Sequence, residues 1–300
     1  MKLVSYGPMG RERPGVIADD DLILDVGRAS KNRFTTIRAL LDEGPDGLGM
    51  VANWLASPED DWFVPRAGAR LGPPLTNPTK IIGLGLNYKS HTDEQSVKIP
   101  KRPLLFSKSN TSLIGDGDPI WHPVDEENLD YEVELGVVIG TRCLRIDAEK
   151  WLDYVAGYTV VNDVSARDAQ FQDRKWFRGK SPDSCCPLGP WIVTADEIEN
   201  PHDLRLTSHL NGEKRQDATT ADLMFDLPAI MAFVSRNVTL LPGDVIATGT
   251  PGGVGIFMDP VACMKVGDEI VVEVEQIGRL TNKVDKRDEI VASVYPHPLG

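Results

Sequence analysis

Residues 131–140 read YEVELGVVIG, and residues 154–163 read YVAGYTVVND. Both stretches are rich in Val, Ile and Tyr and are bounded by Gly, Asn or Asp, which predicts two strands. Outward from them, similar short runs recur at residues 80–85, 103–108, 189–194, 204–212, 243–250, 268–278 and 280–284. Strands this numerous, with few helices between them, predict a β-rich α+β fold and argue against a doubly wound parallel sheet.

Helical patterns are confined to four segments. Apolar residues recur at three- and four-residue spacing in TTIRALLDE (35–43) and GMVANWLAS (49–57), and helices are also predicted for DAEKWLDYV (147–155) and DLPAIMAFVSRN (226–237). The last of these opens with Asp226 as a candidate cap and has Pro228 in its first turn, both of which favour a helix start.

The N-terminal region predicts a separate small domain. Apolar and polar residues alternate around KLVSYG, RPGVIA and DLILDV, a pattern typical of an antiparallel meander. The Pro- and Gly-rich stretch PRAGARLGPPLTNP (65–78) then predicts a linker. We therefore expect a small α+β domain over residues 1–75 and a catalytic domain over residues 76–300.

Composition and charge restrict the function. A net charge of −13 over 300 residues argues against binding nucleic acid or an anionic membrane surface, which would need a basic field. The first residues, MKLVSYGPMGRERPGV, lack the apolar stretch of a secretory signal, which predicts a cytoplasmic location. The four cysteines form no CxxC pair and the five histidines form no HExxH motif, so any metal should be bound by oxygen.

Three acidic residues are candidate metal ligands. Glu132 and Glu134 are two positions apart in a predicted strand, so their side chains share one face. Two adjacent carboxylates repel unless a cation lies between them, and Asp163 at the end of the next strand could supply a third oxygen for Mg²⁺ or Mn²⁺. A solvent-facing strand for the glutamates and a helix cap for Asp163 remain open alternatives.

Other polar residues could take part in catalysis. In NYKSHTDE, His91 and Glu94 are three residues apart and would share one face of a helical turn, where the carboxylate could orient the imidazole as a base. Lys180 could stabilise an oxyanion, and the amides of PGGVG after Thr250 could bind a carboxylate. The simpler alternatives are a solvated loop, a surface lysine and a glycine-rich turn.

Eight of these motifs occur together and in order: KIIGLGLNYKSHTDE, LLFSKSNTSLIG, YEVELGVVIG, VNDVSARDAQ, GKSPDS, PLGPWIVT, LRLTSHLNGEKRQ and LLPGDVIATGTPGGVG. In this combination the chain strongly resembles the fumarylacetoacetate hydrolase family over about residues 80–284. The resemblance implies a mixed β-sandwich roll that is usually dimeric, so we expect a homodimer. The N-terminal region resembles the small domain of many bacterial members.

The resemblance also implies residue roles. It implies that Glu132, Glu134 and Asp163 bind Mg²⁺ or Mn²⁺, that His91 and Glu94 form the catalytic pair, and that Gln170, Lys180 and Thr250 contact substrate. The stretch SPDSCCPLGP departs from the family pattern, because Pro182 stands where relatives more often have an aromatic residue and Cys185 and Cys186 follow it. Arg167, Arg174, Lys175 and Arg178 lie nearby and could meet a second polar end of the substrate, although a surface location is the simpler interpretation.

The expected activity is metal-dependent hydrolysis of a carbon-carbon bond in a small anionic 2-oxo acid. The substrate would be a 2,4-dioxo acid, either an acylpyruvate or a 2,4-dioxo-3-deoxy sugar acid, and the arginine-rich stretch favours the latter slightly. Decarboxylation of oxaloacetate and isomerisation of unsaturated 2-oxo diacids use the same kind of enolate and stay open. A non-catalytic metal-binding homologue is a further alternative.

Overall fold

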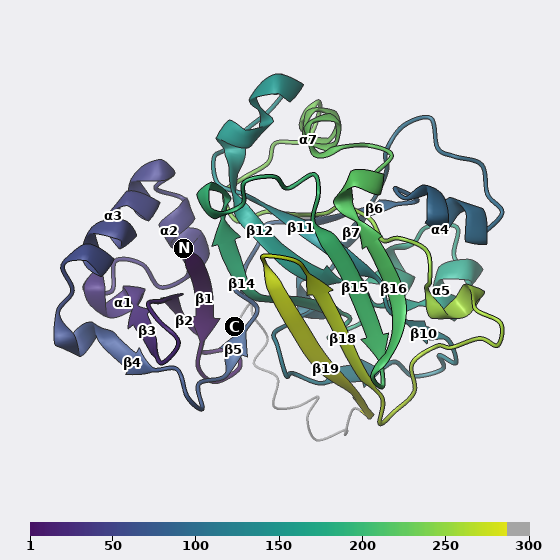
Figure 1. Cartoon of the computed structure of the whole chain (residues 1–300), viewed down its shortest axis with the longest axis horizontal. Coiled ribbons are helices and arrows are strands. Elements are labelled where there is room, and N and C mark those ends of the chain that lie inside the picture. The colour runs from purple at the N-terminus through teal and green to yellow at the C-terminus, as the bar shows by residue number, and fades with distance from the viewer. Residues whose placement is uncertain (287–300) are drawn as a thin grey trace.

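The computed structural model describes residues 1–286, and two sheets dominate it (Figure 1). The larger sheet has twelve strands among the described residues. They are β1 (Lys2–Tyr6), β2 (Arg13–Ile17), β3 (Leu22–Asp25), β4 (Phe63–Pro65), β5 (Leu71–Gly72), β6 (Ile81–Gly85), β7 (Leu104–Lys108), β8 (Leu113–Ile114), β11 (Val133–Ile139), β12 (Val155–Asn162), β14 (Cys186–Thr194) and β17 (Val245–Ala247).

The second sheet has five strands and packs on the first. Its members are β9 (Ile120–His122), β15 (Arg205–Leu210), β16 (Glu213–Thr219), β18 (Glu269–Val274) and β19 (Gly278–Lys286). Strands β15, β18 and β19 contact β11, β12 and β14, so the two sheets form a sandwich. A two-stranded ribbon joins β10 (Leu129–Asp130) to β13 (Ser165–Ala166). The predicted β-rich α+β sandwich is confirmed.

Seven α-helices surround the sheets in the part of the chain that is described. They are α1 (Val26–Ala29), α2 (Ile37–Leu41), α3 (Pro45–Ala56), α4 (Lys89–Glu94), α5 (Arg167–Gln172), α6 (Phe177–Lys180) and α7 (Leu227–Ser235). Figure 1 shows α1 to α3 at one end of the molecule with the N-terminal strands, and α4 and α5 at the other end. The start of α7 is as predicted, because Asp226 accepts a hydrogen bond from the Ala229 amide.

The helix predicted at DAEKWLDYV is present in the tighter 3-10 form. It is η3 (Ala148–Tyr154). Its Trp151 is buried and the segment packs against α7. A short segment held by one large anchor residue can close with the tighter hydrogen-bond pattern, which apolar spacing alone does not distinguish.

The N-terminal meander is confirmed, but it does not stand apart as a separate sheet. Strands β1, β2 and β3 pair antiparallel in sequence order, and β1 also pairs antiparallel with β14 of the central sheet. The predicted linker contains β5, which pairs with β1, and Arg70, whose guanidinium forms an ion pair with Asp118 at 2.6 Å. The domain boundary at residue 75 stays a prediction, and the last part of the predicted second domain, residues 287–300, lies outside the described residues.

Strands β11 and β12 lie at the centre of the fold. Their antiparallel register places Val133 opposite Asn162 and Leu135 opposite Val160. Every residue of β11 is buried; Val133, Leu135 and Val137 enter one hydrophobic cluster, and Val138 enters the cluster on the other face of the sheet. A strand covered on both faces cannot slip by one residue without exchanging those clusters, so this register is firmly set. No helix within residues 1–286 is long and apolar enough to cross a membrane.

Candidate metal centre and active site

Three buried carboxylates meet at the ends of the two central strands. Glu134 is the second residue of β11 and Glu132 immediately precedes that strand. Asp163 follows the end of β12, where its amide donates a hydrogen bond of 2.9 Å to the Glu132 carbonyl. One oxygen from each carboxylate lies within 4.8 Å of those of the other two. All three residues are at most 3% exposed, so the alternative of a solvent-facing strand is wrong. Asp163 does not cap α5, whose N-cap is Ala166.

Basic side chains hold the outer oxygens of this triad. Lys180 Nζ donates to Glu132 Oε2 at 2.6 Å and to Asp163 Oδ2 at 2.7 Å. Lys108 Nζ donates to Asp163 Oδ1 at 2.6 Å, and Arg167 Nη2 lies 2.8 Å from Glu132 Oε1. Glu134 differs, because only its Oε2 has a donor, the Gly249 amide at 2.8 Å, and its buried Oε1 has none. The triad is thus fixed in place with one carboxylate oxygen unpaired.

The electrostatic environment separates the two glutamates. Burial favours the neutral form of Glu132, but the nearby Lys180 and Arg167 outweigh it and hold the pKa of that carboxyl well below its usual value. Burial, together with the charges of Asp163 and Glu132, raises the pKa of Glu134 well above its usual value. Glu134 is therefore the member of the triad whose negative charge lacks compensation from the protein.

These residues fit a hard divalent cation. Four buried carboxylates, those of the triad and Asp130, face three buried cations, Lys108, Arg167 and Lys180, which leaves one negative charge when all are ionised. A divalent cation changes that balance to one positive charge, which one substrate carboxylate would neutralise. The donors are all oxygen atoms, as Mg²⁺ and Mn²⁺ prefer, and Glu134 Oε1 supplies an unpaired one.

The raised pKa of Glu134 predicts a trade-off between stability and metal binding. A carboxyl with a higher pKa in the folded state binds its proton more tightly when folded, so metal-free protein should lose stability as the pH rises from the unfolded pKa to the folded one. Glu134→Gln removes that loss, and its amide can donate to neighbouring carboxylates. We expect it to raise the free energy of unfolding at neutral pH by about 1–3 kcal/mol in EDTA.

The same substitution should weaken binding of Mn²⁺, because it removes an anionic ligand. Urea unfolding at pH 5 and pH 8 and a Mn²⁺ titration measure the two effects. Glu149→Gln is the matched control, since Glu149 is exposed on η3. Equal stability of Glu134→Gln and the parent chain at pH 8 would contradict the assignment of unpaired charge to Glu134.

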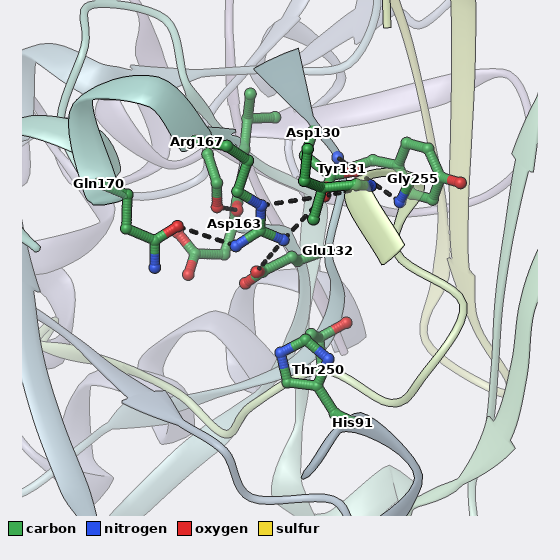
Figure 2. Close-up of polar contacts among 12 residues, drawn as sticks. His91, Asp130, Tyr131, Glu132, Asp163, Arg167, Gln170, Thr250 and Gly255 are labelled. Carbon is green, nitrogen blue, oxygen red and sulfur yellow. Dashed lines mark hydrogen bonds and ion pairs between the residues drawn. The ribbon is translucent and has the colours of Figure 1, made fainter. Parts of the chain in front are cut away.

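The histidine-glutamate pair forms as the spacing predicts. Helix α4 brings His91 Nδ1 to 2.5 Å from Glu94 Oε1, and His91 is only 5% exposed. Glu94 Oε2 in turn accepts a hydrogen bond of 2.7 Å from the Gly253 amide. His91 lies close enough to Glu132 for the two side chains to interact electrostatically, which places the imidazole beside the triad (Figure 2). The alternative of a solvated loop is wrong.

The glycine-rich segment 249–255, which includes the PGGVG loop after Thr250, does bind carboxylates, but they are the protein's own. The Gly249 amide donates to Glu134, the Gly253 amide to Glu94, and the Gly255 amide to Asp130 at 2.7 Å. Gly253 has a φ of +101°, and a Cβ there would lie 2.4 Å from the Arg215 carbonyl oxygen, so only glycine fits. The loop fixes members of both the triad and the catalytic pair relative to each other.

The remaining predicted site residues gather around the same centre. Figure 2 shows Arg167 on one side of Glu132, with His91 and Thr250 on the other. Gln170 is 6% exposed and its Oε1 accepts from Arg167 Nη1 at 2.9 Å. The Thr250 hydroxyl donates to the Val133 carbonyl at 3.0 Å and accepts from Gln216 Nε2 at 2.7 Å. Contact of Gln170, Lys180 and Thr250 with substrate stays a proposal.

Several residues of the site were not predicted. Three buried residues each hold one predicted site residue by a hydrogen bond: Lys108 holds Asp163, Asp130 holds Arg167, and Gln216 holds Thr250. The surface interpretation of Arg167 is wrong, because it is 2% exposed and bridges Asp130 and Glu132. That interpretation is confirmed for a second group of basic residues, namely Arg174, Lys175 and Arg178. A buried lysine at a strand end has no sequence signal of its own, since lysine is usually exposed.

The cysteines of the unusual stretch do not form part of the reactive centre. All four cysteines of the chain are free and buried. Burial raises the pKa of both Cys185 and Cys186 to about 12, so neither is a thiolate at neutral pH. They pack in the hydrophobic clusters on the two faces of the central sheet.

Comparison with known proteins shows which family this chain resembles in sequence. Residues 80–285 match the family described as fumarylacetoacetate (FAA) hydrolase, C-terminal. The chain is 39% identical over 288 residues to oxaloacetate tautomerase Fahd2a, mitochondrial, of Rattus norvegicus, covering 95% of this chain and 91% of that protein. It is 41% identical to oxaloacetate tautomerase FAHD2A, mitochondrial, of Homo sapiens, covering 83% and 79%.

Solved structures agree in fold along most of the chain. Fumarylacetoacetate hydrolase from Exiguobacterium antarcticum is 36% identical with a TM-score of 0.82, covering 96% of this chain and 100% of that one. Maleylpyruvate hydrolase from Sphingobium sp. SYK-6, solved with manganese(II) and pyruvate, is 30% identical with a TM-score of 0.78 and the same coverage. The chain belongs to the fumarylacetoacetate hydrolase family.

Proposed function

We propose that this chain is a divalent-metal-dependent enzyme that interconverts the keto and enol forms of oxaloacetate by moving a proton at carbon 3. The observation that carries the proposal is the convergence of the buried triad, Lys180 and the His91–Glu94 pair at one centre. Glu132, Glu134 and Asp163 would hold Mg²⁺ or Mn²⁺. A bound cation would attract electron density from the 2-oxo and 1-carboxylate oxygens and so favour the enolate.

The protein's own residues would handle the proton. His91, with Nδ1–H directed to Glu94, would take a proton from carbon 3 of the keto form through Nε2. The negative charge then moves to the 2-oxo oxygen, where the Lys180 ammonium would stabilise it. The proton that His91 took is then returned to that oxygen, which completes the enol and restores the neutral imidazole, and the reverse sequence regenerates the ketone. Gln170 and Thr250 would orient the substrate.

Relatives named as oxaloacetate tautomerases support this substrate over the one expected from motifs alone. The two reported above are 39% and 41% identical to the chain over 95% and 83% of its length. Oxaloacetate also suits the charge balance of the site, since one carboxylate can neutralise the metal centre. Its second carboxylate would lie toward solvent, where exposed Arg174 and Lys175 are candidates to meet it.

Hydrolysis of a 2,4-dioxo acid is the second candidate. It is favoured by the likeness to a maleylpyruvate hydrolase solved with manganese(II) and pyruvate, and by the intact pair, which could activate water instead of carbon 3. The two reactions share the enolate of a 2-oxo acid and differ in where the His91 base acts.

An assay of the enol chromophore distinguishes these candidates. Stopped-flow absorbance should show that the chain with Mg²⁺ or Mn²⁺ speeds equilibration of enol and keto oxaloacetate, and that EDTA abolishes the effect. A lactate dehydrogenase couple, run in parallel on oxaloacetate and on an acylpyruvate panel, measures pyruvate release. Pyruvate from the panel without faster oxaloacetate equilibration would favour the hydrolase. Inactivity on every substrate with metal bound would favour a non-catalytic homologue.

A further inference from the structure

The base nitrogen of His91 has a partner that the catalytic pair does not account for. Gln95, the C-cap residue of α4, places its side-chain Nε2 at 2.8 Å from His91 Nε2. Glu94 holds the other ring nitrogen at 2.5 Å. Both imidazole nitrogens are therefore engaged by the two residues that end one short helix, and Phe257 lies against the ring with centroids 6.4 Å apart.

The chemistry of the two partners is opposite. A carboxylate can only accept, so Glu94 requires a proton on Nδ1, whereas an amide NH₂ can only donate, so Gln95 requires a lone pair on Nε2. An imidazolium would direct Nε2–H against the amide hydrogens and lose this bond. The carboxylates that face the ring are Glu94 and Glu132, and Gln95 is the partner that requires an unprotonated Nε2.

We propose that Gln95 is a positioning residue that keeps His91 in the neutral Nδ1–H form with a bare Nε2, and that it releases Nε2 when substrate binds. The effect of Gln95 on catalysis rests on the proposed function, whereas its effect on the protonation state of His91 does not. Gln95 is half-buried, and the residues that follow it, 96–99, are exposed, so the amide can move without disturbing the core. Gln95 thus presents the base ready to accept a proton.

Nitrogen NMR on ¹⁵N-histidine-labelled, metal-free chain tests the protonation state directly. The His91 signals are assigned by their loss in His91→Ala, because the chain has five histidines. At pH 7 the parent chain should show a protonated Nδ1 and an unprotonated Nε2. A protonated Nε2 would mean that Gln95 presents its oxygen instead, and would overturn the proposal without affecting the proposed reaction.

Two substitutions test the catalytic role. Gln95→Glu replaces the donor with an acceptor, so both ring nitrogens of the free enzyme should be protonated at pH 7 and kcat/KM should fall about a hundredfold or more as base assistance is lost. Gln95→Leu keeps the volume and removes a bond that is made before substrate binds, so kcat/KM should fall about two- to tenfold and its pH profile should shift to higher pH.

Gln172→Leu is the matched control, since Gln172 is exposed at the end of α5. Thermal unfolding of each variant separates misfolding from a local effect. Nitrogen spectra and pH profiles of Gln95→Glu that match the parent chain would remove Gln95 from this role, even if the tautomerase activity is established.

Discussion

His91→Ala is expected to lower turnover of oxaloacetate about a hundred- to ten-thousand-fold, the usual contribution of a positioned general base. The imidazole lies beside the triad but holds none of its oxygens, since those that have donors are bonded to Lys108, Arg167, Lys180 and the Gly249 amide. Metal affinity should therefore stay close to that of the parent chain. Stopped-flow kinetics and a Mn²⁺ titration measure the two quantities separately.

The control is His202→Ala. His202 packs against Trp151 in a T-shaped arrangement with centroids 5.8 Å apart, so the substitution removes a comparable ring contact away from the triad. It should leave kcat unchanged and cost only some stability. Unchanged turnover in His91→Ala would remove this histidine as the base for both tautomerisation and hydrolysis, and would leave the metal site intact as a proposal.

Local patterns predicted the parts of this protein that depend on near neighbours in the chain. The two-residue spacing of Glu132 and Glu134 and the three-residue spacing of His91 and Glu94 each place a pair on one face of a strand or helix. The order of eight motifs then identified the family. Strand runs were found for the same reason, since β-branched residues bounded by turn residues are a local signal.

Contacts between distant segments could not be predicted in this way. Nothing in RPLLFSK indicates that Lys108 enters the core to meet Asp163, 55 residues later, or that β1 joins β14. The glycine-rich segment binds Glu94, Glu134 and Asp130 through backbone amides. Because no side chain takes part, the only sequence signal of these contacts is the glycines themselves. Gln95 lies next to Glu94, yet its contact with His91 depends on how α4 ends.

Lys108→Met is expected to lower the free energy of unfolding by about 3–5 kcal/mol, because it removes one partner of a buried ion pair. Lys108 is 3% exposed, and its ammonium donates to Asp163 Oδ1, to the Val164 carbonyl at 3.3 Å and to the Lys180 carbonyl. Methionine nearly matches its length but leaves those acceptors without a donor. Urea unfolding in EDTA measures the loss.

The same substitution should weaken Mn²⁺ binding about ten- to a hundredfold, since residues that orient metal ligands usually matter by that much. The Lys108 ammonium connects the Asp163 carboxylate to the Lys180 carbonyl. Its loss should therefore let Asp163, a proposed metal ligand, move and should also shift the Lys180 side chain. Lys80→Met is the matched control, because Lys80 pairs with buried Asp244 on another part of the central sheet. It should cost stability and leave Mn²⁺ affinity unchanged. If Lys108→Met bound Mn²⁺ as tightly as the parent chain, the triad would be set by its strands alone, and the buried lysine would serve only the fold.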